Sequence, residues 1–338
     1  MIKEAIKKVA GGEDLTFSEM EKAFTEIMAG AAEPAQISAF ITALSMKTET
    51  AQEITSAAKV MRRFAYSIKV REAREPVLDT CGTGGSGADT FNISTASALA
   101  AAGCGVKVAK HGNRSASSRC GSADVLEKLG VNIALKPKDV EKCVKKIGIG
   151  FMFAPLFHSA MKHAAGVRRS IGIRTIFNIL GPLSNPANAT CQVLGVFDRK
   201  LTGVMARVLG DLGIRRAFVV HGLEKLDEIS IAGPTQVSEL KNKRVSTYLI
   251  TPEKFGIKRA RLKDIKGADA DTNAKIILSV LKGAKGACRN AVLLNCAYGL
   301  VAASKAKDIK AGIRLAEISI DSGAALDKLE KLIKYTNQ

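Results

Sequence analysis

Strand-like and helix-like segments alternate from residue 77 onward, and this alternation constrains the fold more than any other feature of the chain. Short apolar runs predict the strands, at 77–81, 106–109, 192–197, 217–221 and 245–250. Helical patterns occupy segments between them, as at 95–103 and 122–129. The alternation predicts an α/β domain over 77–338 with a mostly parallel, helix-flanked sheet. Because ligands of such sheets bind at the carboxyl ends of strands, we expect the functional residues there.

The first 66 residues show helical periodicity in place of this alternation. Thr-x-x-Glu patterns at 16–19 and 50–53 are capping boxes that predict helix starts. Pro34 suits the first turn of a helix between them. We therefore expect a small all-helical domain over 1–66, joined to the large domain by a charged hinge over 67–76.

The composition agrees with a globular protein of two domains. A chain of 338 residues with 46% hydrophobic content can bury a large core. The seven cysteines include no Cys-x-x-Cys pair, so we expect reduced thiols and a cytoplasmic protein. The amphipathic N-terminus lacks the apolar core of a signal peptide. The longest weakly apolar run, at 96–108, is too short and too rich in Gly and Ala to span a bilayer.

The formal net charge of +19 raises the question of a polyanionic partner. Strongly basic surfaces are typical of proteins that bind nucleic acids. The Lys and Arg residues are spread along the chain, however, without a block of five or six like charges. Aromatic residues that could stack bases do not alternate with them. We interpret the charge as a solvated basic surface and expect no nucleic-acid partner.

Two predicted loops, at 79–87 and 110–118, combine glycines, small hydroxyl residues and cations. Each follows an apolar run, so both are expected at the carboxyl edge of the sheet. Glycines let backbone N–H groups approach an anion, and Asn113 and the hydroxyl groups add side-chain hydrogen bonds. Lys110 supplies positive charge. Together the loops predict a pocket for a highly phosphorylated sugar.

The spacing Gly82-x-Gly84-x-x-Gly87 also matches the dinucleotide-binding fingerprint. That motif needs an acidic residue about 20 positions later to bind a ribose diol. This chain has Lys110 and His111 at the end of the next strand, which disfavours a nicotinamide cofactor. A nucleotide-binding P-loop is excluded because no Gly-Lys-Ser/Thr closes the loop.

The two loops and the blocks after them resemble the anthranilate phosphoribosyltransferase family, in the class III, nucleoside-phosphorylase-like group of phosphoribosyltransferases. The matching blocks cover nearly the whole chain: Gly-Thr-Gly-Gly at 82–85, Asn-Ile-Ser-Thr at 92–95, Lys-His-Gly-Asn-Arg at 110–114, Gly-Ser-Ala-Asp at 121–124, Phe-Ala-Pro at 153–155, Met-Lys-His at 161–163, Val-Arg-Arg at 167–169 and Gly-Ile-Arg-Thr-Ile-Phe-Asn-Ile-Leu-Gly-Pro-Leu at 172–183. The resemblance implies a glycosyltransferase of tryptophan biosynthesis. Its reaction would move the phosphoribosyl group of 5-phosphoribosyl 1-diphosphate to the amine of anthranilate, giving N-(5-phosphoribosyl)anthranilate and diphosphate.

The resemblance also implies how the chain is assembled. A later segment within 173–190 is expected to join the helical domain, and a homodimer is expected to form through that domain. The implied partners are phosphoribosyl diphosphate, anthranilate, a second copy of the chain and anthranilate synthase. A membrane partner is not implied.

For the donor, the resemblance implies catalysis by positioning and electrostatics, with Lys110 the most important residue. The implied phosphoribosyl diphosphate site consists of Gly82, Gly85, Ser86, Thr90, Asn92, Ser94, Thr95, Lys110, Asn113, Arg114, Ser115, Ser117, Ser118 and Ser122. Ser86 departs from the family, which usually has Asp at this position. The substitution removes a negative charge near the diphosphate and keeps a hydrogen-bonding group.

For anthranilate, the implied site consists of Gly82, Asn113, Arg168, His111 and His158. A carboxylate suits a planar guanidinium, so we assign it to Arg168 in the Val-Arg-Arg block. Arg169 and Arg174 are alternatives that could equally be surface or packing cations. The histidines, with His163, are expected to form polar walls and not to transfer protons.

A metal site is expected after the predicted strand 217–221, where Asp227 and Glu228 stand side by side. Two carboxylates at a strand end can hold Mg²⁺, which keeps water and phosphate oxygens as its other ligands. The block His-Gly-x-x-x-x-Asp-Glu at 221–228 matches the family, and the hydroxyl of Ser94 is the implied third ligand. The expected cofactor is therefore Mg²⁺.

Two other functions remain open. A related phosphoribosyltransferase or phosphorylase could use a different acceptor, such as a nucleobase, although a nucleobase offers no carboxylate to Arg168. A non-catalytic relative could bind nucleic acid through the basic surface. The complete loop at 110–114 and the Asp227–Glu228 pair argue against the second function, because a binding module needs neither.

Overall fold

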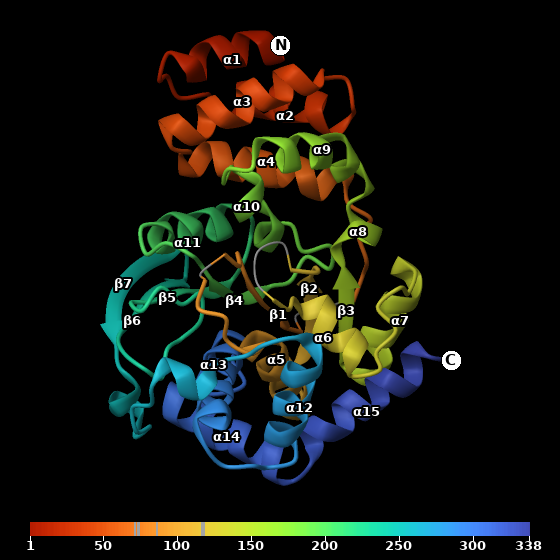
Figure 1. Cartoon of the computed structure of the whole chain (residues 1–338), viewed down its shortest axis with the longest axis vertical. Helices are drawn as coiled ribbons and strands as arrows, with labels where there is room; N and C mark the ends of the chain where they lie inside the picture. Colours follow the sequence, from red (N-terminus) through yellow and green to blue (C-terminus); the bar gives the residue numbers. More distant parts are fainter. Residues whose placement is uncertain (71, 73–74, 86, 116–118) are drawn as a thin grey trace.

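The computed structural model describes residues 1–70, 72, 75–85, 87–115 and 119–338. A helical bundle lies at one end of the molecule and a sheet covered by helices at the other (Figure 1). This arrangement confirms the predicted fold class: a small helical N-terminal domain followed by an α/β domain. No helix in the described part of the chain is both long enough and apolar enough to cross a membrane.

The bundle contains α1 (Ile2–Ala10), α2 (Phe17–Met28), α3 (Pro34–Lys47) and α4 (Ala51–Phe64). Both predicted capping boxes are present, because Thr16 and Thr50 accept hydrogen bonds from the N–H groups of Glu19 and Glu53. Pro34 occupies the first turn of α3, as predicted. The inner faces of α2 and α3 bury large side chains such as Phe24 and Phe40, which hold the bundle together.

Two later helices pack against this bundle. α9 (Lys162–Ile171) packs against α2 and α3, and α10 (Phe177–Leu180) packs against α4. α10 falls within the expected segment 173–190, whereas α9 precedes it. Arg62 at the end of α4 donates to the carbonyl oxygens of Leu183 and Leu212, at 2.7 and 3.2 Å. The bundle is therefore bonded directly to the α/β domain.

The sheet has seven strands in the order β3-β2-β1-β4-β5-β6-β7. They are β1 (Val77–Gly82), β2 (Lys107–Gly112), β3 (Ile149–Phe153), β4 (Cys191–Gly195), β5 (Arg216–Gly222), β6 (Thr235–Lys241) and β7 (Arg244–Ile250). Strands β1 to β5 are parallel to one another, and β6 and β7 form an antiparallel edge. The prediction of a mostly parallel sheet is therefore confirmed. The sequence analysis did not identify β3 and β6. It also ended β2 too early, because Lys110 and His111 lie within this strand.

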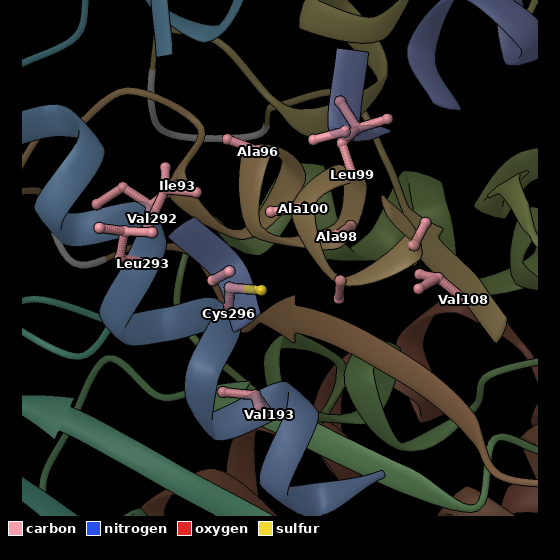
Figure 2. Close-up of a cluster of buried hydrophobic side chains, with 14 of the residues drawn as sticks. Ile93, Ala96, Ala98, Leu99, Ala100, Val108, Val193, Val292, Leu293 and Cys296 are labelled. Carbon is pink, nitrogen blue, oxygen red and sulfur yellow. The ribbon is translucent and has the colours of Figure 1, made fainter. Parts of the chain in front are cut away.

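Helices cover both faces of the sheet. The main core lies under α5 (Ile93–Gly103) and α13 (Ala287–Ala302), where Leu99, Val292 and Cys296 meet Val108 and Val193 of the strands (Figure 2). α11 (Leu201–Asp211) covers the opposite face, between the sheet and the bundle. The remaining helices are α6 (Ser122–Lys128), α7 (Pro137–Ile147), α8 (Ala154–Phe157), α12 (Ala270–Leu281), α14 (Ile309–Asp321) and α15 (Ala324–Thr336), with 3₁₀ turns at Ser159–Met161, Gly181–Leu183, Pro252–Phe255 and Leu262–Ile265.

Candidate active site

The carboxyl ends of β1, β2 and β5 lie at one edge of the sheet. β1 is parallel to β2 and to β4, and β4 is parallel to β5, so these strands end together. The two glycine-containing loops and the Asp227–Glu228 pair all follow these ends, beside the N-terminus of α5. This edge therefore brings together segments that are more than 100 residues apart in the sequence.

Lys110, Ser94 and Glu228 form the centre of this edge. The Lys110 ammonium donates to the carbonyl oxygen of Thr80 and, at 3.3 Å, to the hydroxyl of Ser94. The backbone N–H of Ser94 donates to Glu228 Oε1 at 3.1 Å. Because Lys110 is on β2, Ser94 on α5 and Glu228 after β5, these bonds join three elements of the fold. The sequence analysis assigned all three residues to the donor or metal site.

The charges in this cluster depend on one another. Burial and the neighbouring Asp227 carboxylate raise the pKa of Glu228 to about 8, while Lys110 opposes that change. Burial likewise raises the pKa of Asp79 and lowers that of Lys110, and the attraction between these two groups opposes both changes. A further cation at this position would favour the ionised form of Glu228.

Asp227 packs tightly against β1 and β4. A Cβ atom added to Gly82 would lie 3.0 Å from Asp227 Oδ2, and one added to Gly195 would overlap the carbonyl of Asp227. Glycine at both positions therefore lets the Asp227 carboxylate reach the end of β1. Asp227, Glu228 and Ser94 supply the hard oxygen donors that Mg²⁺ prefers, and the Ser94–Glu228 bond keeps them close together, so the site fits this ion. The described ranges contain no group of three or more His, Cys, Asp or Glu residues that could hold a metal ion.

The loop after β1 is held by Thr83 and Gly85. Gly84 and Gly85 have φ angles of 65° and 75°, which favour glycine. The Thr83 hydroxyl accepts from the N–H of Phe197 at 3.0 Å, and the Gly85 carbonyl accepts from Arg174 at 2.6 Å. Ser86, the departure from the family pattern, lies outside the described residues. The main chain of Thr90 pairs with that of Lys266 in an isolated antiparallel bridge.

Asn92 connects the loops at the start of α5. Its amide donates to the Cys120 carbonyl at 3.2 Å and accepts from Asn273 of α12 at 2.9 Å. Both ends of this side chain therefore bond to protein, and a phosphate contact by Asn92 stays a prediction. Thr95, in the first turn of α5, has a buried hydroxyl that lacks a hydrogen-bond partner among the described residues.

Asp124 of α6 holds the loop after β2. Its carboxylate accepts from the N–H groups of Ser115 and Gly121, at 3.1 and 2.8 Å, and from Arg114 at 2.9 Å. The guanidinium of Arg114 also pairs with Glu127, so binding of phosphate by Arg114 would require these contacts to break. The Asn113 carbonyl accepts from the Ser122 hydroxyl at 3.4 Å. Ser117 and Ser118 lie outside the described residues.

His111 and His158 form a buried pair beside this loop, with ring centroids 5.0 Å apart. Burial lowers the pKa of His111 to about 3 and that of His158 to about 4, so both rings are neutral at pH 7. His111 Nε2 and both ring nitrogens of His158 are buried and lack a hydrogen-bond partner of good geometry in the described parts of the chain, although the backbone of Gly181 and of Ser184 partly opposes the fall in the pKa of these rings. Such nitrogens are available to a polar ligand.

Arg168 lies on α9, with its guanidinium carbon 5.2 Å from the centre of the Phe177 ring. Its side chain is half-buried, and burial lowers its pKa. No ion pair of Arg168 exists among the described residues, in contrast to the exposed Arg114. His163, on the same helix, lies against Gly30 of the bundle, where an added Cβ would be 2.6 Å from its ring. The structure therefore places His163 in the bundle.

Comparison with known proteins agrees with this geometry. Residues 3–65 match the helical bundle domain of a glycosyl transferase family, and residues 74–326 match its α/β domain. The anthranilate phosphoribosyltransferase of Geobacter sulfurreducens is 55% identical over 350 residues, which cover 100% of both chains. That of Citrifermentans bemidjiense is 54% identical, covering 100% of this chain and 99% of the relative.

The chain belongs to the anthranilate phosphoribosyltransferase family. This assignment confirms the resemblance drawn from the sequence blocks. Among solved structures, the family member from Thermus thermophilus has a TM-score of 0.94 at 42% identity, covering 99% of each chain. The Saccharomyces cerevisiae enzyme in complex with phosphoribosyl diphosphate and Mg has a TM-score of 0.90 at 29% identity, covering 99% of this chain and 98% of that one.

Several residues of this family member support the site without having been predicted. Asn295 of α13 accepts from the N–H of Ile229 and donates to its carbonyl, both at 3.0 Å, which fixes the residue after Glu228. Asn185 donates to Asp79 at 2.8 Å. The sequence contained a signal for Asn295, because this amide interrupts the long apolar run 291–302 of α13. Asn185 offered no comparable signal.

Proposed function

We propose that this chain is a Mg²⁺-dependent anthranilate phosphoribosyltransferase, which acts in tryptophan biosynthesis. It transfers the phosphoribosyl group of 5-phosphoribosyl 1-diphosphate to the amine of anthranilate and releases diphosphate. The observation that carries this proposal is the set of bonds joining Lys110, Ser94 and Glu228 at the carboxyl edge of the sheet. Membership of the family supports the same reaction.

The acceptor needs no general base. The amine of anthranilate is a weak base, so it is neutral at pH 7 and carries a free electron pair. The lowered pKa values of His111 and His158 make both rings weak bases, which agrees with a reaction that needs no general base. The barrier lies in breaking the anomeric C–O bond, which leaves positive charge on the ribose and negative charge on diphosphate. Catalysis then depends on positioning both substrates and stabilising the leaving group.

The donor binds where the two loops meet α5. Backbone N–H groups of Gly82 and Gly85, the hydroxyl of Thr95 and the start of α5 contact phosphate oxygens, while Lys110 supplies positive charge. Lys110 is well placed for this because it already reaches Ser94. The other donor-site residues of this proposal are Ser86, Thr90, Asn92, Asn113, Arg114, Ser115, Ser117, Ser118 and Ser122.

Asp227, Glu228 and Ser94 would hold the metal. When bound, Mg²⁺ neutralises the charge that develops on the leaving diphosphate. The chain keeps these oxygen donors together in two ways. The N–H of Ser94 bonds to Glu228, and Asn295 bonds to the N–H and the carbonyl of Ile229, the residue after Glu228.

The acceptor binds beside the histidine pair. Arg168 binds the carboxylate of anthranilate through its planar guanidinium. Within the described residues no carboxylate of the protein forms an ion pair with Arg168 and so competes for it. His111 and His158 form a polar wall against the ring, and Gly82 and Asn113 complete the site. This arrangement holds the amine toward the donor. As the C–N bond forms and the C–O bond to diphosphate breaks, the amine proton passes to the released diphosphate or to water, and not to a side chain of the protein.

We also propose a cytoplasmic homodimer. All seven cysteines are free, which supports a reducing compartment. Met46 on α3 is 82% exposed, and a dimer through the helical domain would cover such an apolar side chain. Contact with anthranilate synthase, the source of the acceptor, belongs to the same proposal.

The deciding experiment follows the loss of anthranilate fluorescence in the presence of phosphoribosyl diphosphate and Mg²⁺. We expect loss only when all three components and the protein are present, and recovery of N-(5-phosphoribosyl)anthranilate. A folded protein that leaves anthranilate unchanged but joins phosphoribose to a nucleobase would overturn the acceptor. Ser86 would then be the first residue to restore to Asp.

A further inference from the structure

Arg174 has contacts that neither the reaction nor the sequence analysis explains. It follows α9, and its side chain is exposed. Nevertheless its Nη2 donates to the carbonyl of Gly85 at 2.6 Å, and its guanidinium carbon lies 4.3 Å from the centre of the Phe197 ring. A guanidinium that is both hydrogen-bonded and stacked is held in one orientation. Arg174 is therefore fixed against the loop after β1.

The backbone of Arg174 is tied to the other domain. Its carbonyl accepts from the hydroxyl of Ser45, on α3 of the helical bundle, at 3.0 Å. One residue therefore contacts the bundle through its main chain and the donor loop through its side chain. Arg168, which we assign to the acceptor, lies on the helix that ends just before Arg174.

Phe197 contacts both Arg174 and the loop after β1. Its N–H donates to the Thr83 hydroxyl at 3.0 Å, while its ring packs under Arg174. The turn is thus bonded to Phe197 at Thr83 and to Arg174 at Gly85. Gly84 and Gly85 within it both have positive φ angles. Glycines lose more conformational freedom on ordering than other residues, so an unattached turn of this kind is costly to fix around a ligand. The Arg174 bond limits that freedom before the ligand arrives.

We propose that Arg174 is a positioning residue, which holds the turn at Thr83, Gly84 and Gly85 in its diphosphate-binding conformation and links it to the helical domain. The inference rests on the proposed function for the identity of the ligand. Arg174 acts through the loop and through Phe197. The planar, stacked guanidinium is thus the feature that matters, and positive charge alone does not replace it.

The test compares Arg174→Ala and Arg174→Lys with a matched control, Arg63→Ala. Arg63 is also an exposed arginine that stacks near a phenylalanine ring and bonds to neighbouring side chains, but it lies on α4 of the bundle. We expect both Arg174 variants to raise the KM for phosphoribosyl diphosphate about tenfold, as for loss of one charged hydrogen bond. The KM for anthranilate and kcat should change less than about twofold, and the control should match wild type.

Hydrogen exchange provides a readout that does not depend on activity. Without substrates, amides in the connection between β1 and α5 should exchange faster in both Arg174 variants than in wild type or the control. Ser45→Ala should produce a smaller change in the same direction, because it removes only the link to the bundle. Unaltered exchange and KM in Arg174→Ala would overturn the proposal.

Three further outcomes separate the alternatives. Full recovery in Arg174→Lys would mean that charge, and not the stacked geometry, acts on the donor, which contradicts a positioning role. An inactive wild type would overturn the proposed function, yet the exchange measurement would still decide whether Arg174 orders the loop. No effect of Ser45→Ala would overturn the link to the helical domain alone.

Discussion

The residues proposed to bind the donor differ from those proposed to bind the acceptor in charge and in hydrogen bonding. At the donor end, Lys110 and Glu228 are both bonded within the protein, and each alters the pKa of the other. At the acceptor end, His111 and His158 are neutral and have buried nitrogens without partners in the described residues. Arg168 likewise has no ion pair there.

This difference follows from the ligands. A diphosphate with its metal brings large charges, which are stabilised well only by groups already oriented before binding. Anthranilate is a flat aromatic with one carboxylate, so it needs a dry surface, a cation and polar atoms that are not otherwise engaged. The donor end should therefore contribute to the stability of the free protein, whereas the acceptor end should gain its partners mainly on binding.

Lys110→Met should have the largest effect. It removes the ammonium that opposes the raised pKa values of Asp79 and Glu228, and it removes charge from the leaving group. We expect kcat/KM for phosphoribosyl diphosphate to fall about thousandfold, with a lower melting temperature. Lys107→Met is the control, because Lys107 pairs with Glu75 at the opposite end of the same strand. Activity within tenfold of wild type would show that the cluster does not stabilise the donor.

Arg168→Ala should have a smaller and more selective effect. Loss of a two-pronged charged contact should raise the KM for anthranilate about a hundredfold. The KM for phosphoribosyl diphosphate and the melting temperature should stay close to wild type, because Arg168 has no ion pair to lose among the described residues. Steady-state kinetics with each substrate varied in turn measures both values. Arg169→Ala is the control, because Arg169 is the exposed residue next to Arg168 on the same helix. An equal rise in both KM values would contradict separate donor and acceptor ends.

The donor end was largely predictable from the sequence. Lys110, Ser94 and Glu228 lie in short motifs next to strand ends, and parallel strands place such ends together. Strand β3 was missed because the apolar run Ile149–Phe153 directly follows α7, and a run of that length does not distinguish strand from helix. β6 was missed because Thr235–Lys241 has only weak alternation, and its pairing with β5 and β7 defines it.

Contacts between distant segments were not predictable. Arg174 reaches Gly85 across 89 residues, and Asn295 reaches Ile229 across 66. The assignment of Arg114 to phosphate stays a prediction, whereas its ion pairs with Asp124 and Glu127 of the next helix were not predicted. A single sequence shows which residue types are present, whereas the partner of each exposed arginine is set by the folded arrangement.

The smallest predicted effect is the loss of folding stability at acidic pH, which we attribute to the pair His111 and His158. The pKa values of about 3 and about 4 lie below the ordinary value of 6.5, so the folded state favours the neutral rings. Their contribution to stability is complete above pH 6.5 and is lost as the pH falls toward those values. Each ring should cost about 1.4 kcal/mol of unfolding free energy per pH unit within that range.

Urea unfolding of wild type and His158→Gln between pH 8 and pH 5 tests this expectation. Over that range Glu228, whose pKa is raised to about 8 in the folded protein, contributes a slope of opposite sign, and this contribution is common to both proteins. The difference between the two slopes below pH 6.5 therefore reports the His158 ring. Replacing His158 should lower the slope below pH 6.5 by about 1.4 kcal/mol per pH unit, because His111 still has to stay neutral and buried. An unchanged slope would mean that the ring of His158 gains a proton without cost in the folded protein. Its nitrogens would then be solvated in the free state, and the contrast between a prebuilt donor end and a dry acceptor end would fail.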